Sequence, residues 1–86
     1  MIKDDLPLIH ALIAAFLLFE SCGPDEVNPD TAVRGMENMA SSLLALEQSD
    51  QLALRAKLEQ IAEDARDQAY RGFVYALPDM IGLASR

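Results

Sequence analysis

The stretch from Leu6 to Cys22, LPLIHALIAAFLLFESC, constrains the fold of this chain more than any other feature. Nine consecutive residues from Ala11 to Phe19 are apolar, and the flanking polar residues are His10, Glu20 and Ser21. A helix that is apolar on all sides has to be surrounded, either by the rest of its own chain or by a second copy. The stretch therefore predicts a buried central helix, which specifies an architecture and no activity.

The remaining composition is that of a small folded domain. The chain has 86 residues, of which 51% are hydrophobic, so it is too apolar for a disordered chain. We expect one helical domain spanning residues 1–86, without convincing strand candidates. A domain this short buries only about two thirds of its unfolded surface, and small domains often compensate by oligomerising. A homodimer is therefore expected.

Helix start and stop signals divide the first half of the chain. Asp4 or Asp5 is expected to cap a first helix over 5–22, with Pro7 in its first turn and Gly23 in the left-handed conformation at its end. Asn28 and Pro29 predict the start of a second helix over 29–47. Its apolar face would hold, at helical spacing, Ala32, Met36, Met39, Ala40, Leu43 and Leu44.

The second half predicts a third helix that is capped by Ser49 or Asp50. Its expected buried face comprises Leu54, Leu58, Ile61, Ala62 and Ala65. We favour a break within 63–67, with Asp67 capping a fourth helix and pairing with Arg71; one continuous helix is the alternative. Pro78 should end or kink the fourth helix, with residues 79–83 docked as a short turn or helix. We expect a core position for six flexible or aromatic residues that would also suit a binding groove: Met36, Met39, Tyr70, Phe73, Tyr75 and Met80.

These patterns together predict an all-α fold. The expected architecture is a small bundle of three main helices plus a short C-terminal helix, organised around the central hydrophobic N-terminal helix.

The negative charge is concentrated in the first half of the chain. Residues 1–50 contain nine acidic and two basic residues, whereas residues 51–86 contain five of each, so the whole net charge of −7 lies in the first half. Such a field repels nucleic acid and anionic membranes and attracts a basic protein. The candidate partner-binding residues are Glu20, Asp25, Glu26 and Asp30. For Glu20, a structural ion pair with Arg34 or with an arginine of the second half is favoured over a functional role.

The sequence offers no catalytic, cofactor-binding or metal-ligating set. His10 and Cys22 would lie about 18 Å apart on one helix, too far for a nucleophile and its base. A single cysteine forms no internal disulfide, and no HExxH or CxxC spacing is present. We therefore expect no enzyme, no cofactor and no metal.

The apolar stretch is expected to be a core helix rather than a targeting or membrane segment. Asp4 and Asp5 follow Lys3, and Glu20 stands where a signal peptide needs a small or apolar residue. The run is also too short for a transmembrane span, which needs about 20 apolar residues. A bacterial cytoplasmic protein is the expectation.

Three classes of function are compatible with these features. The first is a non-enzymatic protein–protein interaction or scaffolding protein, homodimeric, whose acidic half contacts a partner. The second is an immunity-type or antitoxin-like inhibitor that presents its acidic surface to a basic toxin or enzyme. The third is an enzyme or ligand carrier with a site at a dimer interface.

Overall fold

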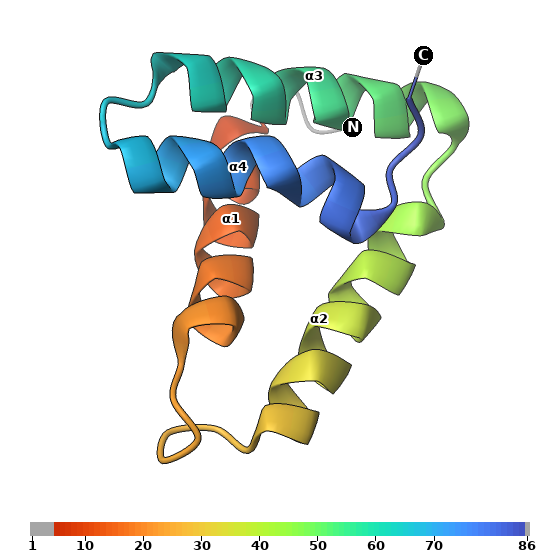
Figure 1. The fold of residues 1–86 in the computed structure, drawn as a ribbon. Coiled ribbons are helices and arrows are strands. Elements are labelled where there is room, and N and C mark those ends of the chain that lie inside the picture. The colour runs from red at the N-terminus through yellow and green to blue at the C-terminus, as the bar shows by residue number, and fades with distance from the viewer. Residues whose placement is uncertain (1–4, 86) are drawn as a thin grey trace. The chain divides into compact units, whose positions relative to one another are not determined.

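The computed structural model describes residues 5–85, and within that range it contains α-helices and no strand. The helices are α1 (Leu6–Ser21), α2 (Pro29–Leu44), α3 (Gln48–Asp64) and α4 (Gln68–Ile81), as Figure 1 shows. The all-α expectation is confirmed, and α4, with 14 residues, is nearly as long as the other helices. The chain divides into two compact units, Met1–Met39 and Ala40–Arg86. A single domain with a bundle arrangement stays a prediction.

The first unit contains α1, the loop 22–28 and most of α2. Asp5 occupies the N-cap position of α1 and Pro7 lies in the first turn, as expected, but the Asp5 side chain makes no capping hydrogen bond. Asp4, the other expected cap, lies outside the described residues. The prediction of a left-handed Gly23 is wrong. Cys22 leaves the helix in an extended conformation (φ −69°, ψ 141°), so the chain needs no left-handed residue there.

The start of α2 agrees with the prediction in its chemistry. The Asn28 side chain accepts a hydrogen bond from the backbone N–H of Asp30 at 2.8 Å, and Pro29 is the first helical residue. The helix ends at Leu44 rather than at residue 47. Two i→i+3 hydrogen bonds, from Ala45 N to the Ser42 carbonyl and from Leu46 N to the Leu43 carbonyl, close its end.

The side chains of α1 are buried on one side only. Ile9, Ile13 and Phe16 recur at helical spacing and are at most 2% exposed. Leu6, Leu8 and Leu18 are 46%, 54% and 59% exposed. The apolar helix is therefore not surrounded in the single chain, and its expected central position stays a prediction.

In the second unit, α3 packs against α4 (Figure 1). The expected break is present: α3 ends at Asp64, and the Asp67 carboxylate caps α4 by accepting a hydrogen bond from Tyr70 N at 2.7 Å. The start of α3 was expected at Ser49 or Asp50, but Glu47 is the N-cap residue. The buried residues follow one stripe on each helix, with Leu54, Leu58 and Ala62 on α3 and Val74, Leu77, Pro78 and Ile81 on α4.

The prediction that Pro78 ends the fourth helix is wrong. The helix continues to Ile81 and ends at Gly82, whose φ of 90° is the only positive φ among the described residues. The Pro78 carbonyl accepts hydrogen bonds from Gly82 N and Leu83 N, both at 3.0 Å, in a Schellman-type ending. Ile81 and Leu83 are buried, so the segment after Pro78 is docked, as expected.

The core position expected for the methionine and aromatic set is wrong. Four of the six side chains are only half-buried, namely Met36, Met39, Tyr70 and Phe73, and two are exposed, Tyr75 and Met80. The buried positions hold mainly aliphatic residues instead, and Phe16 is the one buried aromatic residue in the described part of the chain.

Two helical glycines should respond differently to alanine. A Cβ at Gly72 would meet no atom within 4 Å, whereas a Cβ at Gly35 would lie 3.1 Å from Cζ of Phe19. Gly72→Ala should therefore stabilise the protein by about 1 kcal/mol in urea unfolding. Gly35→Ala should increase the free energy of unfolding clearly less, or decrease it, because the Phe19 ring has to move. Equal gains in both variants would show that α2 does not approach Phe19 closely.

Candidate functional site

An apolar hollow lies in the first unit, where α1 ends and α2 begins. Its volume is about 240 Å³. We call it the α1–α2 hollow. It is lined by Phe19, Glu20, Cys22, Pro24, Val27, Pro29, Ala32, Val33 and Met36. One of these nine residues is charged, so the lining is mainly apolar.

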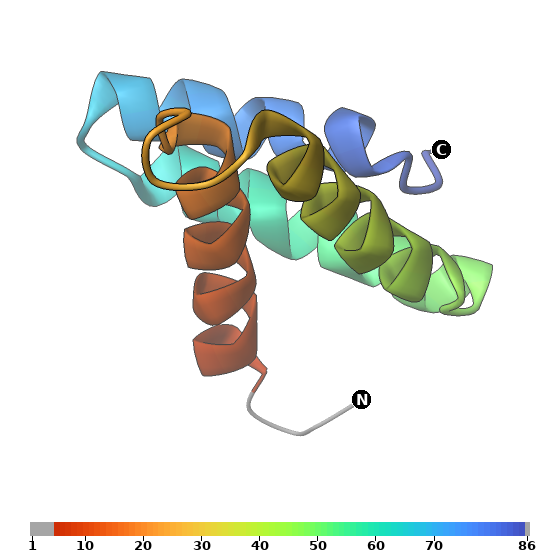
Figure 2. The same cartoon turned by 90° about the horizontal axis from the view of Figure 1, so that it is seen from below.

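The loop that forms one side of this hollow is held by its own backbone. Glu26 N and Val27 N both donate to the Gly23 carbonyl, at 3.0 and 3.2 Å, and Ala32 N donates to the Asn28 carbonyl. Figure 2 shows this loop passing from the end of α1 to the start of α2. These hydrogen bonds fix the backbone of the loop at the edge of the hollow.

All four candidate partner-binding residues lie at this end of the first unit, and all are exposed. Glu20 is in the last turn of α1, Asp25 and Glu26 are in the loop, and Asp30 is in the first turn of α2. We call these four residues the acidic rim. The ion pair considered for Glu20 is not formed: within residues 5–85 its carboxylate contacts no arginine closely enough for a salt bridge.

The residues considered for catalysis are not assembled. His10 is exposed on α1, whereas Cys22 is half-buried at the other end of that helix, with its thiol donating to the Phe19 carbonyl at 3.4 Å. In the described part of the chain, no three His, Cys, Asp or Glu side chains are grouped so that they could hold a metal ion. Nor does any described helix have the length and apolar character required to cross a membrane.

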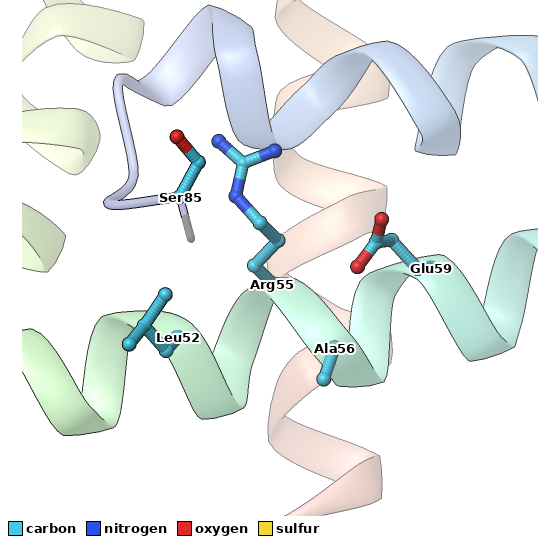
Figure 3. Close-up of a pocket in the computed structure, with 5 residues that line it drawn as sticks. All are labelled: Leu52, Arg55, Ala56, Glu59 and Ser85. Carbon is cyan, nitrogen blue, oxygen red and sulfur yellow. The ribbon is translucent and has the colours of Figure 1, made fainter.

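A second hollow, of about 350 Å³, lies in the second unit beside α3. It is lined by Leu52, Arg55, Ala56, Glu59 and Ser85, and Figure 3 shows Arg55 projecting from α3 between Ser85 and Glu59. The Arg55 guanidinium is already engaged. Its Nε donates to the Ala84 carbonyl at 2.8 Å, and its Nη2 donates to the Leu83 carbonyl at 2.9 Å and to Asp79 Oδ1 at 3.0 Å.

Gln51, one turn before Arg55, completes this polar contact. Its Oε1 accepts a hydrogen bond from Ala84 N at 3.0 Å, and its Nε2 donates to the Leu44 and Leu46 carbonyls at 3.1 and 2.9 Å. Gln51 and Arg55 therefore hold the 82–85 segment along α3. This hollow has a structural arginine at its edge rather than a free cation that would attract an anion.

The role of Arg55 is not visible in the sequence alone. It stands on a helix face with Glu59 and Glu63, where it looks like an ordinary solvated charge. Its partners are 24 to 29 residues away, and no local spacing indicates them. Arg71, expected to pair with Asp67, instead donates from Nε to the Ala65 carbonyl at 3.2 Å.

Comparison with protein-family models, curated proteins and solved structures gives no match for this chain. Function therefore has to be inferred from the residues and their geometry.

Arg55 should stabilise the second unit mainly through backbone carbonyls rather than through its ion pair. Asp79 is 81% exposed, so Asp79→Asn should cost less than about 1 kcal/mol. Arg55→Met should cost about 1.5–3 kcal/mol, because it leaves the part-buried Leu83 and Ala84 carbonyls without their donor. Urea unfolding of both variants measures the difference. Equal losses would mean that the ion pair, and not the carbonyl contacts, carries the effect.

Proposed function

We propose that this protein is a non-enzymatic protein–protein interaction module that forms a homodimer through the outward face of α1. The observation that supports this proposal is the exposure of an almost entirely apolar helix. Leu6, Leu8 and Leu18 are each about half exposed, and between Leu6 and Phe19 the helix has no charged residue. A monomer rarely leaves such a surface open to water.

The positions of the exposed residues suit a helix–helix contact. Opposite the buried side of α1, Pro7, Ala11, Ala14 and Leu18 recur at intervals of four, three and four residues, and all four are exposed. This is the spacing of a coiled-coil seam. The two alanines let a second helix approach closely, while Leu8 and Leu18 supply the larger apolar contacts.

A dimer would also give α1 the surroundings that its composition requires. In the dimer, one side of the helix is buried by its own chain and the other by the second copy, so α1 becomes the central element. Burying a leucine fully contributes about 1.5–3 kcal/mol. Leu8 and Leu18, half exposed in each of two chains, would therefore contribute about 3–6 kcal/mol to the dimer.

Light scattering coupled to size exclusion tests this proposal directly. The wild-type protein should have the mass of a dimer at both low and high salt, because the contact is apolar. The double variant Leu8→Gln/Leu18→Gln keeps the net charge and the helix propensity. It should weaken the dimer by about two orders of magnitude or more and shift the mass toward the monomer.

Met80→Gln is the matched control. Met80 is 48% exposed on α4, so the substitution removes a comparable apolar side chain from another surface and should leave the dimer intact. A monomeric wild-type protein at about 100 μM would refute the proposal, because even a weak specific dimer is populated there. Equal dissociation by Met80→Gln would place the contact elsewhere. Circular dichroism of each variant establishes that the helices are retained.

A further inference from the structure

The α1–α2 hollow and the acidic rim belong to the same end of the first unit. Glu20 is in both, and Asp25, Glu26 and Asp30 alternate in sequence with the lining residues Pro24, Val27 and Pro29. One exposed acidic residue, Glu20, therefore lines the apolar depression, and the other three are direct sequence neighbours of lining residues. This combination indicates what kind of occupant fits, which neither feature does alone.

The size of the hollow favours a side chain over a metabolite. Sites for small molecules usually have volumes of about 300–1,000 Å³ and enclose most of the ligand. At about 240 Å³ and open to one side, the α1–α2 hollow is smaller than that range. It suits one large aliphatic or aromatic side chain that is presented by another polypeptide.

The charge around the hollow favours a basic polypeptide. Residues 19–36, which span the lining of the hollow, contain four acidic residues and one basic residue, Arg34. Lysine or arginine on either side of the inserted side chain would face the rim, and complementary charge speeds association and excludes acidic competitors. Nucleic acid and anionic lipid carry the wrong sign of charge for this surface.

We propose that the α1–α2 hollow is a docking site for a basic segment of a partner protein, with one apolar side chain of that segment in the hollow and its lysines or arginines against the acidic rim. The inference rests on the proposed interaction role and specifies the chemistry of a partner other than a second copy. It uses a different surface from the dimer, because Phe19 lines the hollow and Leu8 and Leu18 do not.

Cys22 provides a native reporter for this site. It is the only cysteine in the chain, it lines the hollow and it is half-buried. A thiol-reactive chromophore therefore labels one position, and an occupant of the hollow should slow that labelling. No substitution is needed to place the probe.

The experiment uses a short synthetic peptide with one central leucine flanked on both sides by lysine and arginine. This peptide should bind the wild-type protein and slow Cys22 labelling several-fold. Replacing its leucine by serine should weaken binding by roughly tenfold, since the apolar anchor is lost. Raising the salt from about 50 mM to about 300 mM should weaken it by a similar factor, because the rim is exposed. A peptide with glutamate in place of the basic residues should not bind.

Two charge-matched variants distinguish a local effect of the acidic rim on peptide affinity from the effect of the protein's overall negative charge. Asp25→Asn/Glu26→Gln/Asp30→Asn removes three rim charges and should reduce peptide affinity at least about tenfold. Glu47→Gln/Glu59→Gln/Glu63→Gln removes three exposed charges from the second unit and should change it less than about threefold. The same loss in both variants would refute a docking site at the hollow.

Two other outcomes would also overturn the inference. Equal binding of the leucine and serine peptides would show that no apolar side chain is inserted, and unchanged Cys22 labelling in the saturated complex would show that the hollow is empty. Failure of the homodimer can be distinguished from either. A monomeric Leu8→Gln/Leu18→Gln protein that still binds the peptide supports docking on its own, and a stable dimer without peptide binding refutes only the docking site.

Discussion

The uneven distribution of apolar side chains among the four helices is the constraint on which this structure depends. α3 and α4 each carry one buried stripe, and the two helices pack against each other. α1 carries apolar residues on every side and buries only Ile9, Ile13 and Phe16. A chain of 86 residues has little further surface with which to cover the rest. The excess apolar surface of α1 is therefore where association should begin.

Charge is arranged so that it does not oppose such association. The whole net charge of −7 lies in the first 50 residues, yet the stretch from Leu6 to Phe19 contains none of it. The acidic residues near α1 are confined to its two ends: Asp5 is the N-cap residue, Glu20 is in the last turn, and Asp25, Glu26 and Asp30 lie in the loop and at the start of α2. In the proposed dimer, like-charge repulsion between the two copies would thereby be kept away from the apolar face, while the four carboxylates of the acidic rim are exposed.

Local signals in the sequence were sufficient for most helix boundaries. Asn28 with Pro29, and Asp67 before Tyr70, are helix start signals whose hydrogen bonds involve residues within three positions, so spacing alone reveals them. The same reasoning did not predict which glycine after a helix adopts the left-handed conformation. Gly23 and Gly82 both follow a helix, but only Gly82 is left-handed, because there the chain turns back and donates to the Pro78 carbonyl.

Contacts between distant residues were beyond such reasoning. Arg55 looked like one more charge on a polar face, and its carbonyl partners at Leu83 and Ala84 carry no side-chain signature at all. Backbone carbonyls are present at every residue, so no sequence pattern shows which of them an arginine will reach. The acidic rim was identified from the sequence, whereas the apolar hollow beside it depends on how α1 and α2 diverge from a short loop, which spacing does not encode.

The contacts of Gln51 have a consequence for the order of the chain. The side-chain nitrogen of Gln51 donates to the Leu44 and Leu46 carbonyls, and its oxygen accepts from Ala84 N. The beginning and the end of the α3–α4 pair are therefore both within reach of one side chain. Neighbouring ends are the condition under which a segment tolerates circular permutation. Joining Ser85 to Ala45 by a short linker and opening the chain at the loop 65–67 would retain the buried stripes of both helices. The α3–α4 pair would then be held together by the packing of its two helices, and the order of the helices in the chain could be reversed.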